Sequence, residues 1–204
     1  MQTPDFFNQV PPLKLRDPLA DFLGATTDGI IEYTYLDVVK LAGHSCPTVA
    51  GAYQLTRHAL RALYGDALPE RGAIRVEIRE DKTQGVTGII ANVVAMLTGA
   101  STDTGFKGIA GRFDRRNLLV FSANIPLEIR YTRLDTGAQV DAAAHLREVT
   151  GETDMPAQLQ RGIRGEASPE EALRFGHVWQ DRVRRILLEH GEDPRVFVIQ
   201  KPSR

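Results

Sequence analysis

The stretch Gly43-His44-Ser45-Cys46-Pro47 separates two segments of different periodicity and so decides how the middle of the chain folds. Before it, residues 30–41 are dense in β-branched and aromatic side chains, which is typical of a strand. After it, apolar residues recur at three- and four-residue spacing over 48–64, and Gly65 follows where a helix would end. The sequence therefore predicts a strand, a turn and then an amphipathic helix.

This turn brings a thiol and an imidazole together. Pro47 suits the first turn of a helix, where its missing N–H costs nothing, so Cys46 should lie at or beside the N-cap. The positive end of a helix dipole favours a thiolate, which is both a nucleophile and a metal ligand. His44 lies two residues earlier and could act as a second ligand or as a base. The simpler alternative makes Cys46 a small buried residue and His44 a hydrogen-bonded loop residue.

The rest of the chain predicts an α+β fold with a mixed or antiparallel sheet packed against two or three helices. Residues 86–97 are nearly all apolar and predict a buried helix, and residues 155–167 resemble a linker. Ser168, Pro169 and Glu171 supply an N-cap, a helix-starting proline and a capping-box glutamate for a helix that runs to about His190. Strands are expected at residues 73–78, 118–122, 128–134, 138–144 and 195–199.

We expect one domain with three parts. Residues 1–29 contain Pro4, Pro11, Pro12 and Pro18 and predict an irregular N-terminal arm. Residues 30–150 form the α+β core, and residues 151–204 add the linker, the long helix and a closing strand.

Three further residues are candidates for binding a ligand. Residues 86–97 have only Thr87 and Asn92 as polar exceptions, and a buried amide such as Asn92 needs a hydrogen-bond partner, either a ligand or another helix. Thr102 and Lys107 belong to a loop rich in Gly, Ser and Thr that suits an oxyanion or carboxylate, although its spacing is not that of a nucleotide-binding P-loop. His58 lies about 18 Å beyond Cys46 along one helix, so we expect it to be partly exposed and not to share a metal.

Composition excludes several classes of protein. The formal net charge is -1 and no dense Lys/Arg block is present, which argues against nucleic acid as a partner. A single cysteine cannot form an intramolecular disulfide. No apolar run is long enough for a signal peptide or a membrane span, so we expect a cytoplasmic protein without a membrane partner.

Two blocks resemble the FmdE family, named after a component of formylmethanofuran dehydrogenase, over about residues 37–122. The first is Gly43–Pro47 with its helix, and the second runs from Leu97-Thr98-Gly99 to Gly105-Phe106-Lys107-Gly108. The resemblance implies an α+β core in which the Gly-His-x-Cys-Pro motif contributes to a metal site, with His44 and Cys46 as ligands. Lys107 would match the lysine of the family's Gly-Lys-Gly loop.

The chain departs from the family pattern where other ligands would be expected. Asn92 stands near the position of the family's aspartate, Ala100 replaces a cysteine, and the zinc-finger domain that often follows is absent from the 204 residues. The resemblance therefore implies a divalent metal, zinc being the first choice, in a site poor in protein ligands.

Three functions follow as hypotheses. The leading one is a metal-binding protein with a small-ligand pocket built on the motif, its reaction unassigned. The second is a metal-free thiol enzyme in which Cys46 is the nucleophile and His44 the base. The third is an accessory protein that carries metal for a metalloenzyme without turnover. A small molecule and a second copy of the chain, in a homodimer, are the candidate partners.

Overall fold

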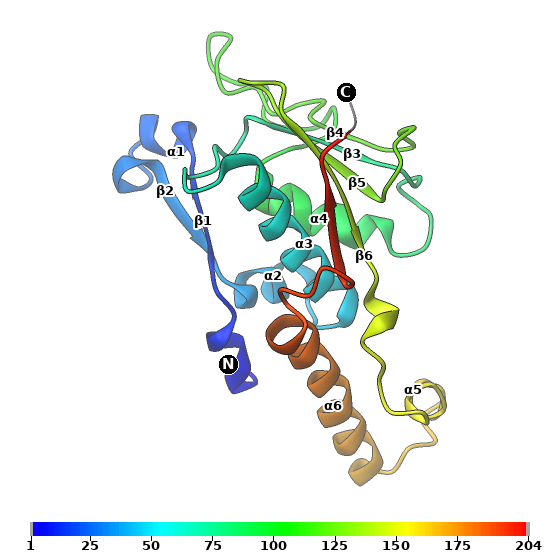
Figure 1. The fold of residues 1–204 in the computed structure, drawn as a ribbon. Coiled ribbons are helices and arrows are strands. Elements are labelled where there is room, and N and C mark those ends of the chain that lie inside the picture. The colour runs from blue at the N-terminus through cyan, green and yellow to red at the C-terminus, as the bar shows by residue number, and fades with distance from the viewer. Residues whose placement is uncertain (1, 203–204) are drawn as a thin grey trace.

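The computed structural model describes residues 2–202, in which helices pack on a mixed five-stranded sheet (Figure 1). The helices are α1 (Pro18–Phe22), α2 (Tyr35–Ala42), α3 (Pro47–Tyr64), α4 (Thr87–Thr98), α5 (Met155–Ile163) and α6 (Pro169–Arg184), the last continued by a π-helical turn, Arg185–Glu189. The strands are β1 (Leu13–Arg16), β2 (Ile30–Tyr33), β3 (Ile74–Ile78), β4 (Leu119–Val120), β5 (Ile129–Arg133), β6 (Gln139–Ala144) and β7 (Phe197–Gln200).

The larger sheet has the order β4-β3-β5-β6-β7, and β1 pairs with β2 in a separate two-stranded sheet. Strand β4 runs parallel to β3, with α4 in the connection between them, and all other pairs are antiparallel. The predicted α+β fold with a mixed sheet is confirmed.

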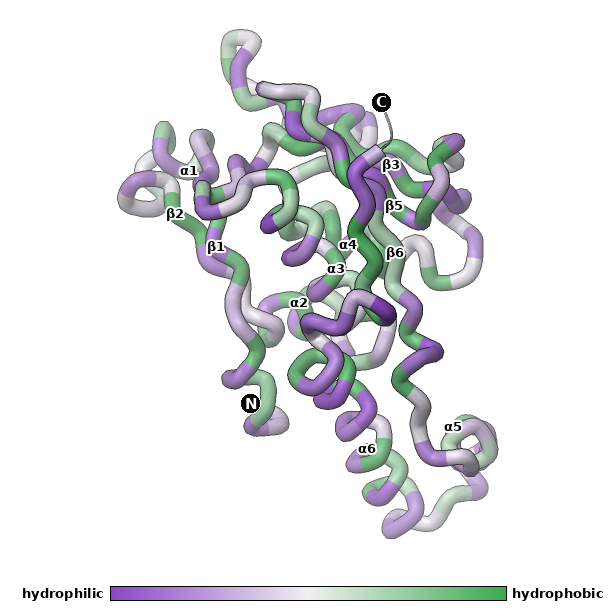
Figure 2. The backbone as a smooth tube through the Cα atoms, viewed as in Figure 1, coloured by the Kyte–Doolittle hydropathy of each residue, from purple (hydrophilic) through white to green (hydrophobic). Residues whose placement is uncertain are grey.

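Helix α3 is the centre of the core. It contacts β5, β6 and β7 of the sheet, and α2 and α4 lie against it. Most of its side chains are buried, including Val49, Tyr53 and Leu60 at 0% exposure. Figure 2 shows hydrophobic residues concentrated in α4 and β7, whereas hydrophilic and hydrophobic residues alternate along α6.

The segment before the turn is a helix for most of its length, so the prediction of one strand over residues 30–41 is wrong. Strand β2 ends at Tyr33, and a capping box then starts α2, with the Thr34 hydroxyl accepting from the Asp37 N–H and the Asp37 carboxylate accepting from the Thr34 N–H. Tyr35, Val38 and Val39 are buried at helical spacing. The β-branched content favours a strand, but the capping residues and tertiary burial outweigh it.

The predicted linker at residues 155–167 also contains a helix, α5. Pro156 lies in its first turn, where proline is tolerated, and Met155 is buried. The capping box of Ser168 and Glu171 starts α6 as expected, with Glu171 N–H donating to the Ser168 hydroxyl at 3.2 Å. In Figure 1, α5 and the first part of α6 project beyond the sheet.

His58 is buried, at 8% exposure, so the expectation of a partly exposed side chain is wrong. Its Nε2–H donates to the Gly191 carbonyl at 2.5 Å, and its Nδ1 accepts from Arg61 at 2.8 Å. The turn after the π-helical segment covers this face of α3, and burial lowers the pKa of His58.

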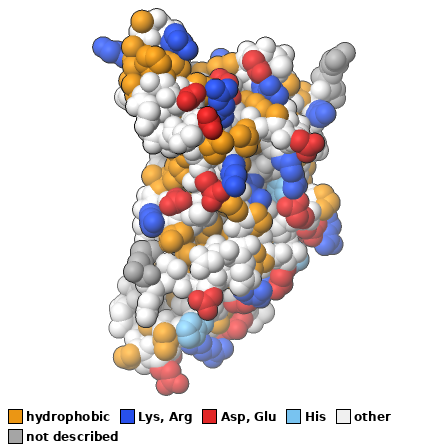
Figure 3. Space-filling view, turned by 90° about the vertical axis from the view of Figure 1, so that its left-hand side faces the viewer, with side chains coloured by type: hydrophobic (Ala, Val, Ile, Leu, Met, Phe, Trp, Pro, Cys, Tyr) orange, Lys and Arg blue, Asp and Glu red, His pale blue; other side chains and the backbone are white. Residues whose placement is uncertain are grey.

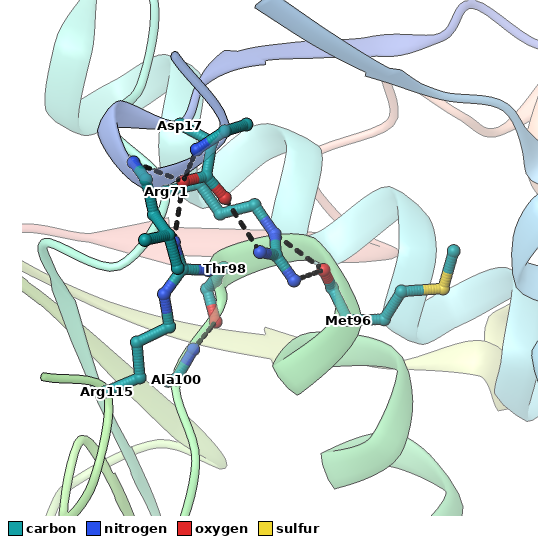
Figure 4. Close-up of polar contacts among 8 residues, drawn as sticks. Asp17, Arg71, Met96, Thr98, Ala100 and Arg115 are labelled. Carbon is teal, nitrogen blue, oxygen red and sulfur yellow. Dashed lines mark hydrogen bonds and ion pairs between the residues drawn. The ribbon is translucent and has the colours of Figure 1, made fainter. Parts of the chain in front are cut away.

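The prediction of an irregular N-terminal arm over residues 1–29 is wrong for part of its length. Strand β1 pairs with β2, and helix α1 follows β1 in the sequence. Asp17, 3% exposed, holds the arm to the body through Arg71 at 2.9 Å and Arg115 at 2.6 Å, and Arg71 also donates to the Met96 carbonyl at the end of α4 (Figure 4). Burial alone would raise the pKa of Asp17, but the two guanidinium groups outweigh it and the pKa lies below its ordinary value.

Charges of both signs are mixed on the side of the molecule that carries β1 and β2, with hydrophobic side chains between them (Figure 3). Within residues 2–202, no helix combines the length and the apolar character needed to span a membrane.

Asp17→Asn should lower the free energy of unfolding at pH 7 by about 3–5 kcal/mol, because it leaves two guanidinium groups without their carboxylate. Since the pKa of Asp17 is depressed below 3.8, its contribution is present above that pH and is lost as the pH falls through the folded-state pKa. The difference between the wild type and the variant in urea unfolding should therefore shrink only as the pH falls below 3.8 and disappear below the folded-state pKa of Asp17.

Asp21→Asn is the matched control. Asp21 pairs with Arg16 at the surface, and both side chains are about half exposed, so its loss should cost no more than about 1 kcal/mol. Equal destabilisation by the two variants would contradict the role given to Asp17.

Candidate functional site

The Gly43–Pro47 motif forms the turn between α2 and α3. Gly43 ends α2 in the left-handed conformation, with φ of 74°, which a side chain would disfavour. Cys46 is the N-cap of α3, where its Sγ accepts from the Val49 N–H at 3.5 Å, and Pro47 occupies the first turn. The predicted N-cap position of Cys46 is confirmed, although a helix, and not a strand, leads into the turn.

His44 is exposed and its tautomer is fixed by the backbone. Its Nδ1 lies 2.9 Å from the Ala42 carbonyl oxygen, which can only accept, so Nδ1 carries the proton. The lone pair of Nε2 is therefore left for another partner, as it is in metal-bound histidines whose second nitrogen donates to a carbonyl. The hydrogen bond of the ring goes to Ala42 and not to the sulfur of Cys46.

Ser45 anchors the turn to α6, a role that the sequence did not reveal. Its hydroxyl lies 2.9 Å from the buried Tyr35 hydroxyl and donates to Gln180 Oε1 at 2.9 Å. Its carbonyl accepts from Trp179 Nε1 at 3.0 Å and from Gln180 Nε2 at 3.1 Å. Tyr35 is fully buried, which raises its pKa. The conformation of the motif thus depends on a hydrogen bond between two residues that are 135 positions apart in the sequence.

The other predicted ligand residues do not meet the motif. Asn92 is exposed on α4, and Lys107 is exposed in the loop between α4 and β4, where the Thr102 hydroxyl contacts Thr104 at 3.2 Å. That loop follows the C-terminal end of α4. The motif's helix, α3, meets the opposite end of α4 across a cleft. The two ends of α4 are about 18 Å apart, because the helix has twelve residues.

The described residues do not assemble a closed metal site. Within residues 2–202, no group of three or more His, Cys, Asp and Glu side chains is positioned to hold one ion. A structural zinc site takes four protein ligands, and this arrangement does not provide them. A metal at His44 and Cys46 would have to complete its coordination with water or with a ligand.

A cleft of about 330 Å³ lies beside the motif, between the first half of α3, the start of α4 and one end of the sheet. Thr48, Gly51 and Leu55 line it from α3, while His44 and Cys46 do not. Gly51 lets Leu146 pack directly on the helix, since a Cβ at this position would lie 2.7 Å from Leu146 Cδ1. Because Thr48 lines the cleft, the cleft begins within one helical turn of Cys46.

None of the polar side chains that line this cleft was a predicted site residue; they are Thr48, Arg79, Glu80, Gln84, Thr87 and Glu128. Thr87 opens α4 and is 6% exposed, and its backbone N–H donates to the Gln84 carbonyl at 3.0 Å. Glu128 uses Oε2 to accept from the Ala144 N–H at 3.0 Å. Thr87 is one of the two polar exceptions in its apolar segment, and its position at the start of the helix was the signal that could have found it.

Comparison with models of known protein families gives no match, and no curated protein matches the chain. Family membership therefore rests on the sequence resemblance alone and stays a prediction.

Ser45→Ala should lower the free energy of unfolding by about 1–3 kcal/mol, because the buried Tyr35 hydroxyl loses its partner. Tyr35→Phe removes that hydroxyl, so the double variant should lose less than the sum of the two single variants in urea unfolding. Strict additivity would show that the two hydroxyl groups are not coupled.

Proposed function

We propose that the chain is a small-ligand-binding protein similar to the FmdE family, with its ligand in the cleft between α3 and α4. The observation that carries this proposal is the cleft itself, about 330 Å³, formed by the helix that starts at Cys46. Small-molecule sites are concave, mostly apolar and supplied with a few polar groups. Leu55, Ile129 and Leu146 provide the apolar wall, and Thr87 and Glu128 provide polar groups.

The neutral fluorophore N-phenyl-1-naphthylamine tests whether this cleft admits an apolar ligand. It should bind the wild type with enhanced fluorescence, and Thr48→Trp should weaken binding by about tenfold or more, because the indole fills the cleft beside Leu55. Fluorescence titration measures both affinities.

Ala62→Trp is the control, since it adds the same bulk at an exposed position near the other end of α3. Equal binding by the wild type and Thr48→Trp, or no binding to either, would contradict a ligand site in this cleft.

We further propose that His44 and Cys46 bind a divalent ion, zinc being the first choice. The specific support is the His44 tautomer, since the Ala42 carbonyl keeps the proton on Nδ1 and leaves Nε2 able to bind a metal. Cys46 is half-buried and contributes a sulfur at the helix N-terminus. With two protein ligands, such an ion would keep positions for water or for a ligand.

Zinc content of the purified, zinc-loaded protein tests this second proposal. About one zinc per chain is expected for the wild type, and His44→Ala and Cys46→Ser should each weaken binding by at least about tenfold, since each removes one of two protein donors. Elemental analysis after dialysis gives the stoichiometry. His177→Ala, an exposed histidine on α6, is the control, and equal zinc in all four proteins would contradict a site at the motif.

Metal-free thiol catalysis by Cys46 with His44, a metal-carrying accessory role and a homodimer stay predictions without a structural observation in their favour. Protection of Cys46 from iodoacetamide by zinc separates the metal site from a free reactive thiol.

A further inference from the structure

A second pocket, of about 340 Å³, lies where the N-terminal arm meets the loop between α4 and β4. It shares no lining residue with the cleft at α3, so what it binds is independent of the proposed function. Three arginines, Arg71, Arg112 and Arg115, line this pocket together with two carboxylates, Glu70 and Asp114.

Two of these arginines share one buried carboxylate (Figure 4). Asp17 accepts from Arg71 at 2.9 Å and from Arg115 at 2.6 Å, and its side chain is 4% exposed. Arg71 has a further acceptor, the Met96 carbonyl at the negative end of α4. The three side chains still carry two positive charges against one negative charge, and an uncompensated charge in a buried position is costly.

Arg115 is the arginine whose hydrogen bonding is incomplete. It is 8% exposed, and only its Nη2 donates, to Asp17, whereas its Nε is buried without a hydrogen-bond partner within residues 2–202. Its guanidinium packs against two glycines, since a Cβ at Gly72 would lie 3.2 Å from Nε and one at Gly99 2.8 Å from Nη1. A buried guanidinium that uses one of its three nitrogens needs another acceptor.

The carboxylates that line the pocket do not supply this acceptor. Asp114 already accepts from Arg116, at 3.0 Å through Oδ1 and at 2.7 Å through Oδ2. Glu70 is exposed and pairs with neither Arg71 nor Arg115, both of which pair with Asp17. The missing acceptor therefore comes from outside the chain.

Arg112 adds a cation at the edge of the pocket. It is exposed, and it forms no ion pair within residues 2–202. Its guanidinium lies 4.7 Å from the ring centroid of Phe113 and 6.0 Å from that of Phe22. Stacking on aromatic rings leaves the donors at the edge of a guanidinium free for a planar acceptor.

We propose that this pocket binds a small oxyanion, a phosphate or carboxylate group, through Arg112 and Arg115. A guanidinium matches the geometry of both groups and forms strong, charge-assisted hydrogen bonds with them. The bound anion also offsets the excess positive charge of the cluster around Asp17.

Isothermal titration calorimetry of the full chain tests this proposal with inorganic phosphate and with acetate, at an ionic strength held constant with NaCl. At least one of them should bind saturably, and the one that binds more tightly assigns the site to a phosphate or to a carboxylate group. Arg112→Gln should weaken that anion by about tenfold or more, because it removes a charged donor.

Arg164→Gln is the matched control, since it removes an exposed arginine at the end of α5 and should leave the affinity unchanged. Arg112 makes no ion pair within the described residues, so Arg112→Gln should unfold in urea at nearly the same concentration as the wild type. A loss of binding by Arg112→Gln then reports on the pocket and not on the fold.

Two further variants test the charges of the pocket wall. Glu70→Gln should tighten binding by about twofold or more, because it removes a like charge from the wall. Arg115→Lys keeps a positive charge near Asp17 but lacks the planar donor set, so it should weaken binding. No saturable binding of either anion, or equal affinity in the wild type and Arg112→Gln, would overturn the proposal.

Discussion

The burial of α3 is the constraint on which the rest of this structure depends. A helix surrounded by β5, β6 and β7 on one side and by α2 and α4 on others has few free faces, so its neighbours must fit its surface closely. Gly51 shows how close the fit is, since Leu146 occupies the space of a missing side chain. The cleft lies beside the first turns of α3, at the edge of this closely packed core. Its position is therefore set by where the packing around α3 stops.

Several elements could be predicted because their signals are local. The N-cap at Cys46 with Pro47, and the capping box at Ser168 and Glu171, fix helix starts through bonds within a few residues, and both predictions are confirmed. Helix α2 is not predicted although its capping box is equally local, because the β-branched and aromatic residues around Tyr33 and Tyr35 favour a strand.

The site was less predictable because it depends on contacts between distant segments. Of the two polar residues in the apolar segment 86–97, Asn92 is the predicted ligand residue, yet it is exposed while Thr87 is buried beside the cleft. Five residues of helix turn a side chain by about 140°, so the two residues could not share a face, and only the position of α3 decides which one is covered. The prediction for His58 is wrong for the same reason, since Gly191 covers it from the other end of the chain.

The contact between Ser45 and Gln180 has a consequence for the order of folding. Its two ends are 135 residues apart, and a bond of that sequence separation carries a large loop-closure cost that the intervening strands must first offset. Helices α2 and α3 can form from local interactions, but the turn between them acquires its final hydrogen bonds only when α6 docks. During synthesis on the ribosome, the hydrogen bonds from Ser45 to α6 would therefore form only after the last quarter of the chain has emerged.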